Sequence, residues 1–419
     1  MKTLMKRLAM KKRSIVAIMM LISLTFASIG FPMNASAAEE SKTIRLAFTD
    51  APTLTIGDMT IYHPSYAAML AFKGAFEKST GGEYTVELYA NGILGDASST
   101  LEQIITGTFE GSTPADGALS AFAPNIQVFS IPYLFSNPTI AYDVLDGEFG
   151  QKLFGDIAKE SGLRVVASYD NGGYRNFTNS VKEVKTAADL KGLNIRVMDS
   201  PVYIKLVEAL GASATPVAFL ELYSALQTGV VDAQENSAVT TLGASLDEVQ
   251  PFCTLDGHLL GLAFLTVGND WYNSLDAKTQ AFVDEAGREA SIAARGTCRF
   301  AEALAISTMT EKGVKVYSPS AEELETFKVS QKPVIEFLNE NVSEGLVDVL
   351  FTAIENVENG VESTSNVSTD TPAATDVVAS ETNDTSKESE SSSPLIPIVI
   401  IILALTVLIV VFMAKRKKK

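Results

Sequence analysis

Two arginines in one stretch of the chain, residues 171–237, have the chemistry needed to bind an organic anion. Arg175 follows a Gly-Gly-Tyr sequence and Arg196 lies in the apolar segment 193–198, and both contexts predict β-strands. A guanidinium group presents a planar set of donors that can hold a carboxylate through two parallel hydrogen bonds, and it stays charged at physiological pH. Two such groups in one stretch favour a site for a small organic acid. The alternative is that both are surface residues without a specific role, which is the commonest situation for arginine.

The same stretch ends in a cluster of acid and amide side chains, formed by Asp232, Gln234, Glu235 and Asn236. Asp232 and Glu235 are candidates for general acid–base chemistry, but no nucleophile or metal ligand accompanies them in the sequence. We therefore expect them to be structural or to orient arginine side chains. The sequence also lacks a GxSxG elbow, an HExxH motif, a phosphate-binding loop and a dinucleotide-binding fingerprint, so we do not expect an enzyme.

Other residues that can carry chemistry are scattered along the chain. His63 precedes Pro64 at a predicted helix start near the carboxyl edge of a sheet, where ligands bind in open α/β folds, although a helix-entry role without ligand contact is the favoured alternative. Asp116 is a possible ligand contact, although a position in a turn without ligand contact is the favoured alternative. Cys253 and Cys298 could form a disulfide in an exported protein or remain two buried thiols. No spacing typical of metal ligands is present.

Five longer motifs follow one another within residues 173–236. They are GYRNFTN at 173–179, DLKGLNIRV at 189–197, LGA at 210–212, ELYSALQTG at 221–229 and VDAQEN at 231–236. In order and spacing they resemble the substrate-binding proteins of TRAP transporters, the tripartite ATP-independent periplasmic carriers of organic acids. The resemblance covers roughly residues 43–345 and points to a solute receptor of the C4-dicarboxylate or sialic-acid type.

The resemblance implies a role for particular residues and partners. By this likeness Arg196 clamps the substrate carboxylate, Arg175 and Asn236 add further hydrogen-bond donors, and Phe219 forms an apolar wall; His63 is retained as a candidate. The expected partners are a small carboxylate ligand and the small and large membrane subunits of a TRAP permease. No cofactor is implied.

The order of predicted elements indicates an α/β fold with two lobes. Strand, helix and strand alternate from residue 43 onward, which favours a parallel or mixed sheet covered by helices. We expect a two-lobed, periplasmic-binding-protein-like fold of type II, with lobe I at about 43–170 and 262–300 and lobe II at about 171–261 and 301–356. The helical pattern at 277–312, in which Gly287 and Gly296 are weak points, predicts a long helix that runs across both lobes, an element that the TRAP proteins also have.

The N-terminal residues 1–37 read as a secretory signal peptide. Six basic residues precede or adjoin an apolar run at 15–31, and Ala35-Ser36-Ala37 has the small-x-small pattern that signal peptidase cleaves. The exported solute-binding domain would then comprise residues 38–360.

The C-terminal end predicts a tether to the membrane. Residues 361–393 form an acidic, Ser/Thr-rich stretch that we expect to be a disordered stalk. Residues 394–414 are apolar and long enough for a transmembrane helix, and the basic tail 415–419 is expected to stay in the cytoplasm. The binding domain would therefore stand at the cell surface, anchored in the cytoplasmic membrane by the C-terminal helix.

The charge of the chain excludes one class of partner and leaves the ligand open. The chain has 33 Lys+Arg against 50 Asp+Glu, a net charge of -17, and 11 of these bases lie in the two terminal segments. The part of the chain between the two terminal segments is therefore strongly acidic, and it would repel the phosphates of a nucleic acid. We expect an extracytoplasmic receptor that delivers a small carboxylate to a TRAP permease. The alternatives are a binding protein of an ABC importer and a membrane-tethered ligand-sensing ectodomain, and dicarboxylates, sugar acids, keto acids and amino acids are all compatible ligands.

Overall fold

The computed structural model describes residues 41–360. The predicted signal peptide at 1–37, the stalk at 361–393, the apolar segment at 394–414 and the basic tail at 415–419 lie outside these residues. Within residues 41–360, no helix combines the length and the hydropathy that crossing a bilayer requires.

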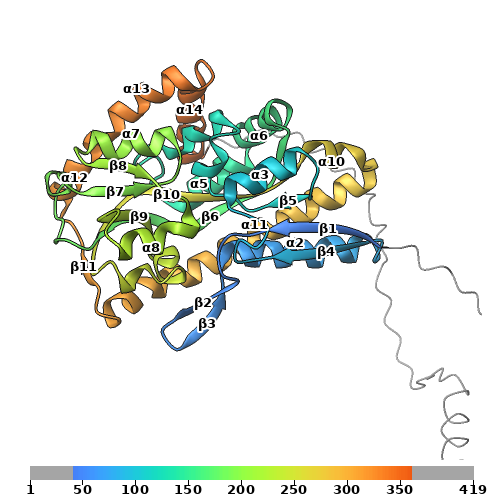
Figure 1. Ribbon diagram of the computed structural model, residues 1–419. Coiled ribbons are helices and arrows are strands. Elements are labelled where there is room, and N and C mark those ends of the chain that lie inside the picture. Colours follow the sequence, from blue (N-terminus) through green and yellow to red (C-terminus); the bar gives the residue numbers. More distant parts are fainter. Residues whose placement is uncertain (1–40, 361–419) are drawn as a thin grey trace, which may run out of the picture. The chain divides into compact units, whose positions relative to one another are not determined.

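One mixed β-sheet organises the described part of the chain (Figure 1). In spatial order its strands are β4 (Tyr84–Tyr89), β1 (Lys42–Ala47), β5 (Gly111–Ser112), β10 (Phe252–Gly268), β6 (Leu163–Asn179), β9 (Ala233–Ser237), β7 (Asn194–Val197) and β8 (Ser213–Pro216), with β11 (Lys315–Tyr317) paired to β10. The pairs β1–β4, β7–β8 and β7–β9 are parallel, whereas β6 pairs antiparallel with β10 and β9. The expectation of a mixed sheet is confirmed.

The two long strands β6 and β10 join the two halves of this sheet. Each has 17 residues, and they pair with each other along most of that length. β10 also pairs with β5 of the β4–β1–β5 half, whereas the later part of β6, from Arg175, pairs with β9 of the other half. Between these regions Gly172 and Gly173 have φ angles of +93° and +92°, a conformation that L side chains rarely adopt. The passage of β6 from one half to the other therefore depends on glycine.

Helices cover the sheet, and their bounds follow the capping and proline signals of the sequence. They are α2 (Pro64–Ser79), α3 (Ala97–Ile105), α4 (Asp116–Leu119), α5 (Pro138–Asp146), α6 (Glu148–Ser161), α7 (Pro201–Ala209), α8 (Leu222–Gln227), α9 (Ala238–Gly243), α10 (Asn269–Ser274), α11 (Ala277–Glu311), α12 (Ala321–Phe327), α13 (Gln331–Asn341) and α14 (Leu346–Glu358). Short 3-10 turns lie at Pro124–Ser130, Ala187–Leu190, Phe219–Glu221, Leu246–Glu248 and Lys328–Ser330. Of the last two helices, α13 packs on α7 and α14 packs on α5 and α6.

The long helix α11 contacts both halves of the fold. It begins at the cap Asp276, whose side chain accepts a hydrogen bond from Thr279 N. It packs on α2 and β6 (Figure 1) and also on α9. Gly287 lies at the contact with β6, because a Cβ atom at this position would lie only 2.0 Å from the carbonyl oxygen of Val166. Gly287, a weak point of the helical sequence pattern, therefore permits close packing of the helix on the strand. At Gly296 nothing lies within 4 Å of such an atom.

A β-hairpin that the sequence analysis missed projects from the body (Figure 1). Its strands are β2 (Thr53–Ile56) and β3 (Met59–Tyr62), inserted between β1 and α2. Leu54 and Ile56 are buried in a cluster that includes Val239 and Leu242 of α9. The hairpin therefore links the chain that follows β1 to a helix of the β9–β7–β8 half.

Candidate functional site

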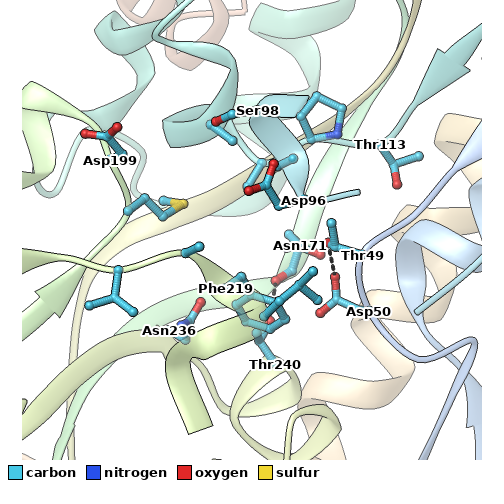
Figure 2. Close-up of a pocket in the computed structure, with 18 of the residues that line it drawn as sticks. Thr49, Asp50, Asp96, Ser98, Thr113, Asn171, Asp199, Phe219, Asn236 and Thr240 are labelled. Atoms are coloured by element: carbon cyan, nitrogen blue, oxygen red, sulfur yellow. Dashed lines mark hydrogen bonds between the residues drawn. The ribbon is translucent and has the colours of Figure 1, made fainter. Parts of the chain in front are cut away.

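A cavity of about 440 Å³ lies beside β6, and residues from both halves of the fold line it (Figure 2). The lining residues are Thr49, Asp50, Ser65, Asp96, Ala97, Ser98, Thr113, Pro114, Ala115, Ala118, Asn171, Arg175, Arg196, Met198, Asp199, Pro216, Val217, Ala218, Phe219, Leu220, Asn236 and Thr240. Four of the five residues predicted from the sequence, namely Arg175, Arg196, Phe219 and Asn236, meet in this wall. The volume and the mixed polar and apolar lining suit a small organic ligand.

Arg196 is a buried cation with few partners. It lies on β7, between β8 and β9, with its side chain 2% exposed. Within residues 41–360 its guanidinium makes one hydrogen bond, from Nε to the carbonyl oxygen of Val217 at 2.9 Å. Burial, only partly offset by Glu235 and reinforced by the charge of Arg175, lowers the pKa of Arg196 to about 10. The group is therefore still charged at neutral pH, and it lines the cavity without forming an ion pair to a carboxylate of the described residues.

Arg175 differs from Arg196 because it has a carboxylate partner. Its Nε donates to Oε2 of Glu235 at 2.5 Å, and its Nη2 donates to Oε1 at 2.8 Å and to the Glu235 carbonyl at 2.7 Å. Burial opposes the charged form of Arg175, but Glu235, together with Tyr203 and Asp116, outweighs burial and raises the pKa of Arg175 above its usual value. This pair connects β6 to β9 and fixes the guanidinium plane at the cavity wall.

The Arg175–Glu235 pair continues into a second buried ion pair. His258 places Nε2 at 3.3 Å from Oε2 of Glu235 and Nδ1 at 2.8 Å from Oδ2 of Asp256. Burial alone would lower the pKa of His258, yet Asp256 and Glu235 together raise it to about 9. Burial likewise opposes ionisation of Glu235, but Arg175 and His258 lower its pKa to about 2. Arg175 is thus held by a charged network that needs no ligand.

Asn236 is positioned by a series of buried amides and a hydroxyl. Its Nδ2 donates to Oε1 of Gln234 at 2.6 Å, and Nε2 of Gln234 donates to Oγ1 of Thr178 at 2.7 Å. Thr178 in turn donates to Oε1 of Gln250 at 3.1 Å. Because one Nδ2 hydrogen is engaged in this way, Asn236 has one N–H and its carbonyl oxygen left for a ligand. Figure 2 shows its side chain in the cavity wall next to Phe219.

Residues between β8 and α8 form the apolar part of the wall. Val217, Ala218, Phe219 and Leu220 all line the cavity, and Val217 also accepts the hydrogen bond from Arg196. The 3-10 turn Phe219–Glu221 begins in this segment. Phe219 therefore contributes an aromatic side chain to the cavity lining.

Another part of the wall is polar, and the sequence analysis did not identify it. Asp50 lies in the loop after β1, where its Oδ2 accepts from Oγ1 of Thr49 at 3.1 Å. Asp96 is the N-cap of α3 and accepts from Ser99 N at 2.8 Å. Oγ1 of Thr240 donates to the carbonyl oxygen of Asn171 at 3.3 Å. The Asx-type start of α3 was visible in the sequence, but nothing in the local pattern of Asp50 indicated a binding residue.

His63 and Asp116 do not line the cavity. His63 caps α2 by accepting from Ser65 N at Nδ1, at 3.3 Å, and its Nε2 lies 4.0 Å from Oδ1 of Asp50. This helix-entry role is the alternative that the sequence favoured. Asp116 is buried and accepts from the hydroxyl groups of Ser130 and Tyr203, at 3.0 and 2.9 Å. Burial raises the pKa of Asp116, although Arg175 opposes this shift.

The two cysteines are separate buried thiols. Sγ of Cys298, on α11, donates to Oδ2 of Asp170 at 2.7 Å, while Cys253 lies within β10. Burial raises the pKa of Cys253 to about 12. Among residues 41–360 no group of three His, Cys, Asp or Glu side chains is arranged to hold a metal ion.

Glu235 has the arginine-orienting role that was expected for it, and Asp232 has a structural one. Oδ2 of Asp232 accepts from the backbone N of Asn194 at 2.9 Å, which connects β9 to the start of β7. Neither carboxylate lines the cavity. The arrangement can bind and orient an anion.

Comparison with known proteins agrees with this geometry. The family described as bacterial extracellular solute-binding protein, family 7, matches residues 59–341. A solute-binding protein of Verminephrobacter eiseniae is 34% identical over 250 residues, which are 59% of this chain and 74% of that protein.

Two solved structures are similar over most of the described residues. The sugar acid binding protein of Advenella mimigardefordensis, in complex with galactonate, has a TM-score of 0.70 and 28% identity over 75% of this chain and 98% of that one. A TRAP periplasmic solute-binding protein of Sulfitobacter sp., with bound β-D-galacturonate, has a TM-score of 0.68 and 27% identity over 75% of this chain and 100% of that one. The two-lobed α/β fold of these binding proteins is thus the fold of this chain, and an enzyme is not indicated. The chain belongs to the solute-binding proteins of TRAP transporters, the bacterial extracellular solute-binding proteins of family 7.

Proposed function

We propose that the protein captures a small organic acid outside the cytoplasm and delivers it to a TRAP permease, with Arg196 as the residue that binds the ligand carboxylate. The observation that carries this proposal is the state of Arg196: a charged guanidinium in a cavity of about 440 Å³, with a single hydrogen bond to Val217 within the described residues. A buried charge without a counter-ion is unfavourable, and a ligand carboxylate would supply that counter-ion.

The remaining predicted residues complete the site. Arg175, whose Nε and Nη2 are engaged by Glu235, contributes its other donors, Asn236 contributes an amide, and Phe219 contributes an apolar surface. Each charge-assisted hydrogen bond to a carboxylate contributes about 1.5–3 kcal/mol. Two or three of them are enough for a micromolar site, about -8 kcal/mol, after the cost of ordering ligand and lobes.

Two comparisons support an acid as ligand. The Advenella protein was solved with galactonate and the Sulfitobacter protein with galacturonate, and both of these ligands carry a carboxylate. The sequence-based alternative of an ABC-type binding protein is not favoured, because the family match is to family 7.

The same proposal includes the segments outside the described residues. A signal peptide at 1–37 would export the chain, and the apolar segment at 394–414 would anchor it, with the acidic stretch at 361–393 as a stalk that lets the domain reach a permease. Fractionation of cells that express the full chain, or a chain ending at Ser393, tests the anchor. Recovery of both forms in the medium would contradict it.

A thermal-unfolding screen against a panel of organic acids tests ligand capture. An acid present at about one hundred times its Kd adds roughly 2.7 kcal/mol to the free energy of unfolding, which is a readily measured shift. The expected result is a shift with one class of acids that is lost in Arg196→Ala. A shift of equal size in that variant would overturn the assignment of Arg196.

A further inference from the structure

The charged residues of the cavity wall are divided between the two halves of the fold. Arg175 and Arg196 lie on β6 and β7, with Asp199 two residues after β7, whereas Asp50 and Asp96 follow β1 and β4 in the other half. The lining contains no lysine. A ligand that reaches across the cavity therefore meets both cations on one half of the fold, whereas the charged groups of the other half are carboxylates only.

The two cations are not equally free to bind an anion. Glu235 accepts two hydrogen bonds from the Arg175 guanidinium through its carboxylate, at 2.5 and 2.8 Å, and so balances that charge. Arg196 has no carboxylate partner within residues 41–360. The wall thus has one cation that lacks a counter-ion, which suits one ligand carboxylate.

Asp50 has no cation to balance it in the described residues. Its Oδ2 accepts from the hydroxyl of Thr49, and its Oδ1 lies 4.0 Å from Nε2 of His63. Burial lowers the pKa of His63, despite an opposing effect of Asp50, so this imidazole is neutral at pH 7. A second carboxylate placed here would meet a like charge and no cation.

The surroundings of Asp50 instead suit hydroxyl groups. Ser65 and Thr113, which belong to the same half of the fold as Asp50, line the cavity together with Asn171 of β6, and Oγ of Ser65 donates to Oδ1 of Asn171 at 3.3 Å. Oγ1 of Thr113 is buried and has no hydrogen-bond partner among the described residues. A ligand hydroxyl can donate to Asp50 and also accept from a threonine, whereas a carboxylate can only accept.

We infer that the cavity selects acids with a single carboxylate and a hydroxylated far end, and that Asp50 is the residue that rejects a second carboxylate. The inference rests on the proposed function, in which Arg196 binds the first carboxylate. It makes Asp50 a specificity-determining residue and excludes dicarboxylates from the ligand classes that the sequence left open.

Matched pairs of sugar acids test this selectivity. Each aldonate, such as galactonate, gluconate or erythronate, is titrated into the full-length chain by calorimetry together with the aldarate of the same carbon chain, in which the terminal hydroxymethyl group is a carboxylate. We expect the best aldonate to bind at least tenfold more tightly than its aldarate. In Asp50→Asn this ratio should fall to about threefold or less, because the repulsion is removed while a polar side chain remains. Asp58→Asn, which removes an exposed carboxylate at the hairpin turn, should leave the ratio unchanged.

The outcomes separate this inference from the proposed function. An aldarate that binds as tightly as its aldonate, with both lost in Arg196→Ala, overturns the role of Asp50 and leaves the Arg196 site standing. A wild-type preference that persists in Asp50→Asn also overturns it. If no acid of either series binds, the proposed function fails and this inference fails with it.

Discussion

Arg175 Nε lies 2.5 Å from Oε2 of Glu235, a residue 60 positions later in the chain. Because of this contact, only one of the two arginines of the cavity has a carboxylate partner within the described residues. Arg175 is neutralised within the protein and connects β6 to β9. Arg196, which has a similar strand context in the sequence, has only the Val217 carbonyl as a partner within the described residues. The positive charge that a ligand encounters is therefore that of Arg196.

Replacing Arg196 should separate binding from stability. Arg196→Ala removes a buried charge that lacks a counter-ion, so we expect the free energy of unfolding without ligand to be unchanged or higher, while the affinity for the acid falls at least tenfold. Arg196→Lys keeps a charge without the planar pair of donors and should bind with intermediate affinity. Urea denaturation and calorimetry measure the two effects. A large loss of stability in Arg196→Ala would show that the residue serves the fold instead.

Replacing Glu235 should have the opposite effect on stability. In Glu235→Gln, Arg175 and His258 both lose a buried counter-charge, and breaking a buried ion pair costs about 3–5 kcal/mol. Glu340→Gln, at an exposed position of α13, is a matched control and should change the free energy of unfolding by no more than about 0.5 kcal/mol. Equal stabilities of the two variants in urea would refute the structural role of the pair.

The buried imidazole of His258 should make stability depend on pH on the alkaline side. Its pKa in the folded protein is raised to about 9 from 6.5, so its protonated form stabilises the fold. This contribution is present in full below pH 6.5 and is lost as the pH rises through 9, with a total on the order of 3 kcal/mol.

Urea denaturation of the wild type and of His258→Gln between pH 6 and pH 9.5 measures this contribution. The stability of the variant should decline less over that interval, because the group that releases a proton is absent. Parallel declines of the two proteins would show that His258 is not the titrating group.

Local patterns in the sequence predicted the position of several helices, including where they begin and end. Pro64 begins α2 as predicted, and the helical pattern that was expected to end at Lys312 ends at Glu311. The hairpin at 53–62 was missed although its signals are present, since Leu54 and Ile56 alternate with polar residues ahead of Gly57. Two strands of four residues each give too short an alternating pattern to be recognised beside the longer elements around them.

The site was only half predictable, and the reason is distance along the chain. Arg196, Phe219 and Asn236 lie within one stretch whose motifs resemble a known family, and they do line one cavity. Asp50 reaches the same cavity from the loop after β1, far from that stretch in sequence. The pairing of Arg175 with Glu235 likewise depends on the register of β6 against β9, in which Phe177 is opposite Glu235. Such contacts follow from the tertiary arrangement and leave no local pattern.

Two glycines of α11 provide a test of how closely this helix must pack on β6. A Cβ atom at Gly287 would lie 2.0 Å from the Val166 carbonyl oxygen, so Gly287→Ala forces the helix away from the strand and should cost about 1–3 kcal/mol. Gly296 is exposed with nothing within 4 Å, so Gly296→Ala should stabilise the protein by up to about 1 kcal/mol, through helix propensity alone. The same substitution in the same helix is thus expected to have opposite signs. Urea denaturation of both variants measures these changes in the free energy of unfolding. A stabilising Gly287→Ala would mean that α11 can move away from β6 without a loss of stability.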